Sequence, residues 1–283
     1  NYKPGSAEKL GVAYRDLRTR NPRLLYGHIT GFGLKSPRVG YDAVVQAESG
    51  FMYLNRPDEA APPQKMPVAL MDLLAAHQLK EGLLAALYRR ERTGEGAYVQ
   101  VSLMDAALAS LANQGAAWLY SKIEPEPSGS EHPSIAPYGT LLHTYVEDEW
   151  ILLAVGNDNQ FQSLCLLLER PKLANDPRFA TNPARVKHRA ALNEALQQAA
   201  AEHHLDDLLA GCEAAGVPAS GVFSIPKALE RRANADLILN DGTDAPGNRK
   251  GLRTAVFSLP VAKHLSPPPA LGEHTDEILS RFS

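Results

Sequence analysis

Apolar positions along the chain alternate between short runs typical of strands and longer stretches with helical spacing. Residues 24–30 and 98–101 are short apolar-rich runs next to glycines, which predicts two buried strands. Residues 73–92 place leucines and alanines on one face and end in arginines and a glycine, which predicts a long helix. Residues 41–52 also have helical spacing, and residues 103–120 are predicted to form a second long helix. This alternation predicts an α/β layer with a parallel sheet.

A segment rich in helix breakers, residues 124–133, divides this pattern into two parts. After it, residues 139–146 and 149–155 flank a polar pair and predict a hairpin. Helical patterns dominate residues 160–215, with interruptions at prolines. The chain therefore divides into a large α/β domain, a smaller α+β domain and a final segment, which we assign to residues 1–133, 134–225 and 226–283.

Composition and charge exclude several classes of function. The formal net charge of −3 leaves no basic surface that would favour nucleic acid. No apolar run reaches membrane-spanning length and no signal peptide opens the chain, so we expect no membrane partner. Cys165 and Cys212 lie in apolar helical contexts without metal-ligand spacing, which predicts buried thiols of an intracellular protein and no metal site.

One carboxylate stands where an apolar run, residues 67–76, turns into the long helix. Asp72 would lie near the positive end of the helix dipole, which favours the ionised form of a carboxylate. An ionised, oriented and partly desolvated carboxylate can act as a nucleophile toward an activated acyl group. The alternative is that Asp72 only caps the helix, as aspartate often does.

Short motifs follow one another along nearly the whole chain. They are Asn1–Tyr2–Lys3–Pro4–Gly5, Thr30–Gly31–Phe32–Gly33, Gly40–Tyr41–Asp42, Ser49–Gly50–Phe51–Met52, Glu91–Arg92–Thr93–Gly94–Glu95–Gly96, Val99–Gln100–Val101–Ser102–Leu103–Met104–Asp105–Ala106, Gly216–Val217–Pro218–Ala219 and Leu271–Gly272–Glu273–His274–Thr275. Each motif is weak alone, but the ordered set resembles the family III CoA-transferases, the group of formyl-CoA transferase and carnitine CoA-transferase.

The resemblance implies a fold and an assembly. The large domain would be nucleotide-fold-like and incomplete at its N-terminus, because the family carries a strand–helix segment before the element that begins at Asn1. The segment 226–283 would return to the large domain and complete it. The family also forms interlocked ring-like dimers, so a homodimer is expected.

The same resemblance gives Asp72 a chemical role. It implies attack by Asp72 on the acyl carbon of a CoA thioester, a mixed anhydride with the enzyme, an aspartyl-CoA thioester and transfer to an acceptor carboxylate. Coenzyme A would be a substrate, with no tightly bound cofactor. Such chemistry requires exclusion of water and donors for the developing oxyanion. Gly156 and Asn157 could form a lid or donor loop, or an ordinary strand–helix turn in which Asn157 or Asp158 is the cap.

Further residues are expected at the substrate site by alignment with the family. The CoA-binding set is Asn1, Tyr2, Lys9, Leu10, Arg38, Tyr41 and Leu103. Arg38 lies next to Val39, which occupies the position of a family lysine, and Lys9 and Arg38 could equally be solvated surface charges.

The acyl group is expected to be a small dicarboxylate. Residues 131–138 and 156–161 resemble the branch that includes succinyl-CoA:glutarate, itaconate and mesaconate CoA-transferases. A second carboxylate on the substrate would need a cationic or amide partner, for which His132 and Arg185 are candidates.

Two other functions remain open at this point. An α-methylacyl-CoA racemase would use a histidine of a Gly-His-Asp motif as an acid or base, but this chain has Tyr41 there, and tyrosine has an unperturbed pKa near 10. A non-catalytic CoA-binding or dimerisation remnant is the second alternative. We expect the cytoplasm as the compartment, or the mitochondrial matrix in a eukaryote.

Overall fold

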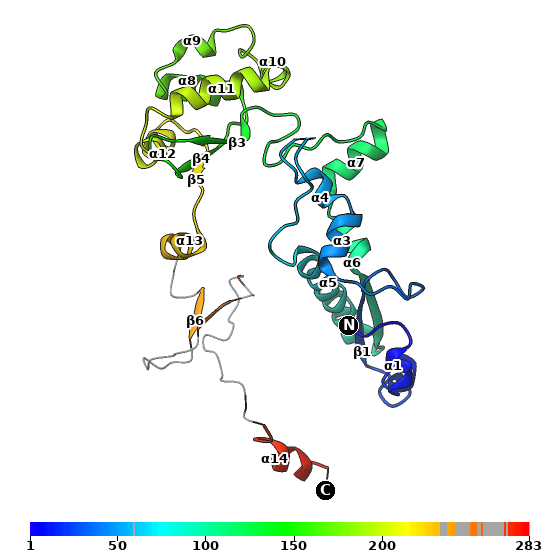
Figure 1. Cartoon of the computed structure of the whole chain (residues 1–283). Coiled ribbons are helices and arrows are strands. Elements are labelled where there is room, and N and C mark those ends of the chain that lie inside the picture. The colour runs from blue at the N-terminus through cyan, green and yellow to red at the C-terminus, as the bar shows by residue number, and fades with distance from the viewer. Residues whose placement is uncertain are drawn as a thin grey trace. The chain divides into compact units, whose positions relative to one another are not determined.

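The computed structural model describes residues 1–58, 60–232, 237–240, 250–253, 256, 269 and 271–282. The chain divides into two compact units, Asn1–Gly221 and Val222–Ser283 (Figure 1). The first unit contains two separate sheets with their own helices, and each part is described by itself. The proposed division at residues 133 and 225 stays a prediction.

The first sheet consists of two parallel strands joined through a long helix. β1 (Leu25–Thr30) pairs with β2 (Ala97–Ser102) in register from Leu25↔Ala97 to Thr30↔Ser102. α5 (Leu70–Thr93) lies between them in sequence and packs against both strands. The strands and the helix confirm the predictions from the apolar pattern.

Glycines allow α5 to approach the sheet closely. A Cβ at Gly27 of β1 would lie 3.2 Å from methyl groups of Leu79 and Leu83, and a Cβ at Gly82 of α5 would lie 2.7 Å from Val99. Alternate residues of a strand point to opposite faces, so Gly27 and Val99 belong to the face covered by α5. Tyr26, His28 and Tyr98 belong to the other face.

Two helices, α3 (Asp42–Glu48) and α6 (Leu103–Ala109), pack against α5. α4 (Phe51–Leu54) contacts α3, α7 (Ala112–Ser121) contacts α6, and two short helices, α1 (Ser6–Lys9) and α2 (Tyr14–Arg18), precede β1. Val45, Met71 and Ala106 form the centre of a fully buried apolar core between α3, α5 and α6. This core fixes the first turn of α5 against its neighbours.

Left-handed residues interrupt the helical segments around α5. Gly50 adopts a left-handed φ of 89° between α3 and α4, and Ala112, at the start of α7, has φ 48° after α6 has ended at Ala109. A left-handed residue cannot continue a right-handed helix, so the prediction of one long helix over 103–120 is wrong, and the helical spacing of 41–52 is divided between two helices.

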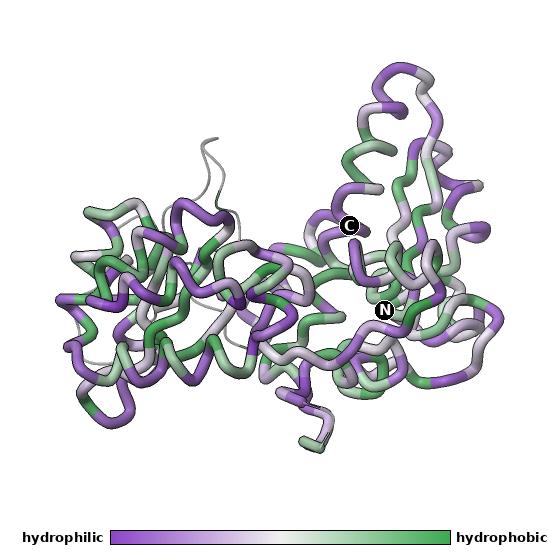
Figure 2. Tube along the Cα trace, turned by 90° about the horizontal axis from the view of Figure 1, so that it is seen from above, coloured by the Kyte–Doolittle hydropathy of each residue, from purple (hydrophilic) through white to green (hydrophobic). Residues whose placement is uncertain are grey.

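The second sheet of the first unit is antiparallel. β3 (Tyr138–His143) pairs with β4 (Trp150–Ala154), which pairs with β5 (Ala219–Gly221), and the predicted hairpin is confirmed. Its helices are α8 (Asp158–Leu167), α9 (Pro171–Ala174), α10 (Asn182–Lys187), α11 (Arg189–Ala200) and α12 (Leu205–Ala214). Figure 2 shows hydrophobic and hydrophilic segments alternating along the helical parts of the trace.

The two cysteines are buried free thiols, as the sequence predicts. Cys165 lies in α8 and Cys212 in α12. Burial raises the pKa of Cys165 to about 12 and that of Cys212 to about 11, so both stay protonated and unreactive at neutral pH.

The second unit contains α13 (Ile225–Arg232), an antiparallel pair of β6 (Ile238–Asn240) and β7 (Lys250–Leu252), and α14 (Thr275–Ser280). The expected return of residues 226–283 to the large domain stays a prediction. Within the described residues, none of the helices combines the length and the apolar character that a membrane span requires.

Gly31 provides a test of the packing after β1. A Cβ at this residue would lie 2.3 Å from the Gly40 Cα, so Gly31→Ala forces two backbone segments apart. We expect a loss of about 1–3 kcal/mol in the free energy of unfolding, measured by chemical denaturation. Gly156→Ala is the control, because its new Cβ would meet only Gln160 Oε1 at 3.5 Å. Equal stabilities of the two variants would contradict the close contact.

Candidate active site

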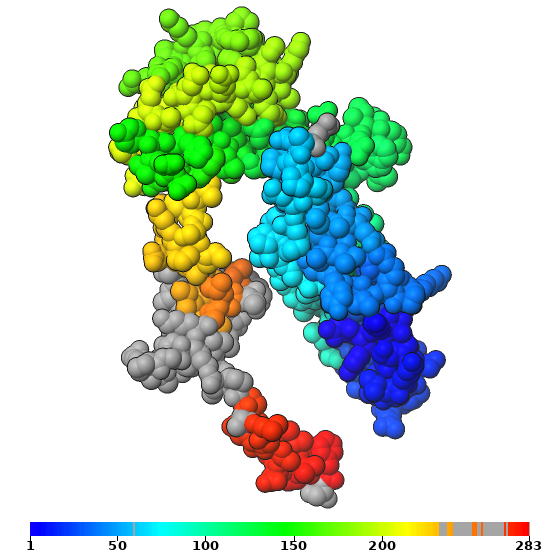
Figure 3. Space-filling model, viewed as in Figure 1, coloured from blue at the N-terminus to red at the C-terminus, as the bar shows by residue number. Residues whose placement is uncertain are grey.

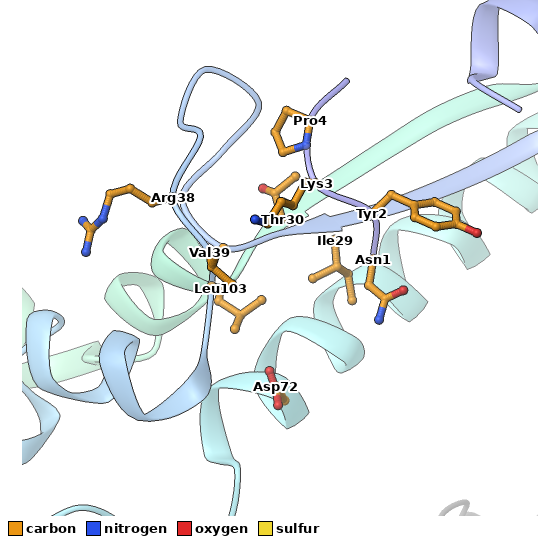
Figure 4. A pocket seen from close by; sticks show the side chains of 12 residues that line it. Asn1, Tyr2, Lys3, Pro4, Ile29, Thr30, Arg38, Val39, Asp72 and Leu103 are labelled. Atoms are coloured by element: carbon orange, nitrogen blue, oxygen red, sulfur yellow. The ribbon is translucent and has the colours of Figure 1, made fainter. Parts of the chain in front are cut away.

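A cavity of about 270 Å³ lies beside the first turn of α5 (Figure 4). It brings together residues from five parts of the sequence. Its lining consists of Asn1, Tyr2, Lys3, Pro4, Ile29, Thr30, Gly31, Arg38, Val39, Gly40, Asp72 and Leu103. Asp72 therefore shares one cavity with four of the residues that the sequence assigns to CoA binding: Asn1, Tyr2, Arg38 and Leu103.

The topology explains why the cavity forms at this edge of the sheet. β1 ends at Thr30 and β2 ends at Ser102, so the carboxyl ends of two parallel strands meet here. A helix that connects parallel strands runs opposite to them, which brings the N-terminus of α5 to the same edge. Ligand sites of open α/β sheets occur at this end of the strands.

Asp72 is the third residue of α5 and has an exposed side chain. The pKa of its carboxyl group is raised, first by partial burial and then by repulsion from the nearby Asp42 carboxylate. The helix dipole acts in the opposite direction and favours ionisation. Asp72 is therefore a more basic carboxylate than the sequence led us to expect, and a more basic carboxylate is a stronger nucleophile once it is ionised.

The cap of α5 comes from another helix. The N-cap residue, Ala69, has no side chain that can accept a hydrogen bond. Instead, Asp42 Oδ1 accepts hydrogen bonds from the backbone N–H groups of Met71 (2.7 Å) and Asp72 (3.4 Å). The interpretation of Asp72 as the cap is wrong. The Asp72 carboxylate has no hydrogen-bond partner among the described residues and remains available for chemistry.

Asp42 is itself held by a buried amide. Gln46 is fully buried, and its Nε2 donates a hydrogen bond of 2.6 Å to Asp42 Oδ2. Gln46 Oε1 accepts from the Met66 N–H at 2.9 Å, which ties the segment before α5 to the same side chain. The four-residue spacing of Asp42 and Gln46 fits a contact within one helix, but the sequence contains no signal for the contact of Gln46 with Met66, twenty residues later.

Arg38 lines the cavity, but its guanidinium group is directed elsewhere. It forms a two-point ion pair with Glu48, in which Nη1 lies 2.9 Å from Oε2, and stacks 3.8 Å above the centre of the Phe32 ring. The pair raises the pKa of Arg38 and lowers that of Glu48 through their hydrogen bonds. Figure 4 shows the Arg38 side chain extending away from Asp72.

Three residues of the predicted CoA set do not line this cavity. Leu10 is 61% exposed, Lys9 lies at the end of α1, and Tyr41 is 68% exposed at the N-cap position of α3. Their contact with CoA stays a prediction.

The possible acyl-site residues lie in other parts of the first unit. Asn157 Oδ1 accepts from Gln160 N at 3.0 Å and caps α8, while Gly156 N donates to Gln160 Oε1 at 2.8 Å. The ordinary strand–helix turn is confirmed, and the lid role stays a prediction. His132 lines a separate cavity of about 630 Å³ together with Arg189, and the backbone oxygen of His132 accepts from Arg189.

Arg185 is not available to a substrate. Its side chain is fully buried and donates to the backbone oxygens of Ala136 (2.6 Å) and Phe179 (3.0 Å) and to Asp158 Oδ1 (2.7 Å). The interpretation of Arg185 as a partner of a substrate carboxylate is therefore wrong. In the described part of the chain, no group of three or more His, Cys, Asp and Glu side chains could hold a metal ion.

The sequence profile of CoA-transferase family III matches residues 1–275. The chain belongs to this family. A succinate–glutarate CoA-transferase of Agrobacterium fabrum is 37% identical over 100% of this chain and 71% of its own length. The human succinyl-CoA:glutarate CoA-transferase is 31% identical over 99% of this chain and 64% of its own length.

Solved structures of the family agree with the fold. A CAIB/BAIF family protein of Brucella suis has a TM-score of 0.82 and 36% identity over 100% of this chain and 74% of that chain. Rv3272 of Mycobacterium tuberculosis has a TM-score of 0.82 and 32% identity over 96% of this chain and 73% of that chain. The chain thus spans about two thirds to three quarters of the length of these four family members.

The contact between Asp42 and the first turn of α5 predicts a pH effect. Asp42→Asn removes a negative charge that raises the pKa of Asp72, so the pKa of Asp72 falls. We expect the acidic limb of the profile of kcat/KM against pH to move to lower pH, because Asp72 then ionises earlier.

Asp105→Asn is the matched control for this experiment. Asp105 lies in the first turn of another helix, α6. Its Oδ2 accepts a hydrogen bond of 2.6 Å from the Ser102 hydroxyl, whereas Asp42 accepts from the backbone of α5. Its substitution should leave the acidic limb in place. An unchanged limb in Asp42→Asn would show that the Asp42 charge does not act on the reacting group.

Proposed function

We propose that the protein transfers CoA from an acyl-CoA donor, with succinyl-CoA as the first candidate, to a small dicarboxylic acid, and that Asp72 is the nucleophile. The observation that carries this proposal is the exposed, unpartnered Asp72 carboxylate beside a cavity at the carboxyl ends of two parallel strands. The named relatives of Agrobacterium fabrum and human, which carry succinate, succinyl-CoA and glutarate in their names, support the choice of substrates.

The chemistry begins with attack of an Asp72 carboxylate oxygen on the thioester carbonyl carbon. The C–S bond breaks, CoA leaves as a thiolate, and a mixed anhydride joins Asp72 to the acyl group. The thiolate then attacks the Asp72 carbonyl, releases the donor acid as a carboxylate and forms the aspartyl-CoA thioester. The acceptor carboxylate reverses these two steps, which returns Asp72 as a free carboxylate and yields the new acyl-CoA.

Each step exchanges one activated acyl bond for another of similar reactivity, so water is the main competitor. The first-turn N–H groups of α5 already donate to Asp42 and to the backbone, so in this proposal the positive end of the α5 dipole favours the negative charge of the developing oxyanion. Lys3 lines the cavity and has no ion pair among the described residues, which makes it a candidate partner for a phosphate or substrate carboxylate. Arg38 is already neutralised by Glu48.

We further propose a homodimer. Apolar side chains lie exposed at the end of α7 and just after it, where Leu119 is 70%, Tyr120 95% and Ile123 72% exposed. In the space-filling view, α7 lies at the surface of the first unit (Figure 3). Exposed groups of large apolar residues of this kind mark interaction sites, and a second copy of the same chain is the commonest partner.

A reducing compartment suits both proposals. Cys165 and Cys212 are unpaired thiols, as is usual for proteins of the cytoplasm or the mitochondrial matrix. CoA enters as a substrate in this scheme, and no tightly bound cofactor takes part.

The nucleophile is tested by trapping. Full-length protein mixed with succinyl-CoA and quenched with hydroxylamine should carry a hydroxamate on Asp72, detected by peptide mass spectrometry. Asp72→Asn should lose the adduct and at least about 10³-fold in kcat, because a neutral amide cannot attack the thioester. Glu81→Gln, on the exposed side of the same helix, should keep both.

Two results would contradict this function. Transfer at the wild-type rate by Asp72→Asn would remove Asp72 as the nucleophile. Absence of an adduct, with deuterium from the solvent entering the α-carbon of a branched acyl-CoA, would indicate racemase-type proton transfer instead.

The dimer is tested by light scattering coupled to size exclusion. The wild type should have twice the mass of one chain, and Leu119→Glu should lower the apparent mass, because it buries a charge in the proposed interface. Leu166→Glu is the control, because Leu166 is similarly exposed (66%) but lies on α8. A monomeric wild type would contradict the proposed homodimer.

A further inference from the structure

The face of the first sheet that α5 does not cover carries a cluster of aromatic side chains. Tyr26 and Tyr98 occupy paired positions on β1 and β2, with ring centres 5.7 Å apart. Tyr14 of α2 stacks on Tyr98 at 5.4 Å and contacts Tyr26 at 5.9 Å. Tyr26 is anchored by a hydrogen bond of 3.0 Å from its hydroxyl to the Val12 oxygen. The Tyr98 ring is thus fixed from two sides.

His28 lies two residues after Tyr26 on the same face and is only 8% exposed. Its Nδ1 lies 2.8 Å from the Tyr98 hydroxyl oxygen, and its Nε2 lies 2.8 Å from the backbone oxygen of Tyr2. A carbonyl oxygen can only accept a hydrogen bond, so Nε2 must carry a proton. In the neutral ring, Nδ1 is then unprotonated and accepts a hydrogen bond from the Tyr98 hydroxyl.

Tyr98 suits this role as a donor. Burial, together with the nearby Tyr26 and Glu8, raises its pKa, so its hydroxyl stays protonated at physiological pH. A hydroxyl can donate or accept a hydrogen bond, so the tautomer is fixed by the Tyr2 carbonyl, which can only accept. Tyr98 matches this tautomer by donating to Nδ1 and holds the ring in place.

The hydrogen bond to Tyr2 connects the aromatic cluster to the cavity beside Asp72. Residues 1–4 all line that cavity, on the side opposite the first turn of α5 in Figure 4. In the described part of the chain, His28 provides the one hydrogen bond that joins residues 1–4 to β1. Without it, this wall of the cavity would be held to the strand by packing alone.

We propose that His28 is a positioning residue for acyl-CoA binding: it fixes residues 1–4 against β1 through Nε2–H and the Tyr2 carbonyl, and the Tyr98 hydroxyl holds its ring by donating to Nδ1. This inference rests on the proposed function, because it assumes that the cavity holds the acyl-CoA. His28 does not contact Asp72, so its effect falls on binding and not on the chemical step.

Two amide substitutions of His28 separate its hydrogen bond to Tyr2 from its hydrogen bond to Tyr98. In His28→Gln, the amide nitrogen is as many bonds from the backbone as Nε2 and can still donate to the Tyr2 carbonyl. In His28→Asn, the amide matches the position of Nδ1 and retains contact with Tyr98, but it is too short to reach Tyr2. The two variants have similar polarity and both leave the rest of the cluster unchanged.

We expect His28→Asn to raise KM for succinyl-CoA and Kd for CoA, the latter measured by calorimetry, by about tenfold, the effect of losing one hydrogen bond from a buried group. Its kcat should stay within about twofold of wild type. His28→Gln should restore KM and Kd to near the wild-type values. Equal KM values for His28→Asn, His28→Gln and the wild type would overturn the proposal. A fall in the kcat and melting temperature of His28→Asn, with no change in its KM and Kd, would also overturn it.

The tautomer gives a readout that does not depend on activity. In the ¹⁵N spectrum of the wild-type protein at pH 8, the His28 ring should show a protonated Nε2 and an unprotonated Nδ1. Tyr98→Phe should shift the Nδ1 signal, because Nδ1 loses its hydrogen-bond donor, and should leave the proton on Nε2. A proton on Nδ1 in the wild type would overturn the assignment of the donor. If the wild type has the expected tautomer but neither binds CoA nor turns over succinyl-CoA, the proposed function fails, and the role of His28 in CoA binding fails with it.

Discussion

The contact between Asp42 and the first turn of α5 is the interaction on which the arrangement of the site depends. A helix that begins after Ala69 has free N–H groups and no local side chain to satisfy them. Asp42 supplies the missing acceptor from α3, and Gln46 holds Asp42 in place from the buried side. The position of Asp72 is therefore set by a side chain thirty residues earlier in the chain.

The capping of α5 by Asp42 also raises the pKa of Asp72. Two carboxylates lie close to one helix end, and the charge of Asp42 opposes ionisation of Asp72. The helix dipole and the N–H groups at this end reduce the repulsion without removing it. A carboxylate that ionises less readily is more basic, and a more basic carboxylate is the stronger nucleophile once it is ionised, which suits the acyl transfer that we propose for Asp72.

The sequence predicts the local elements well and the contacts between distant segments poorly. β1, β2 and α5 follow from apolar spacing, because each element carries its own periodic signal. The breaks at Gly50 and Ala112 depend on left-handed backbone conformations, and only the glycine gives a hint of this in the sequence. Asn1, Tyr2, Arg38 and Leu103 line the cavity. The resemblance to the family singled them out together, whereas the local pattern marks only Leu103, which directly follows a strand end. The direction of the Arg38 side chain was not predictable, since it depends on Glu48 and Phe32.

The backbone contact between Gly31 and Gly40 closes the loop of residues 32–39 at its base. Residues within this loop can change in number and sequence without displacing β1 before it or α3 after it, since longer loops add little closure entropy. Arg38 and Val39 of this loop line the cavity, while Thr30 and Asp42 lie just outside its base. Changes in the loop can thus alter one wall of the cavity while Asp72 keeps its position, which, under the proposed function, gives one scaffold access to many acids.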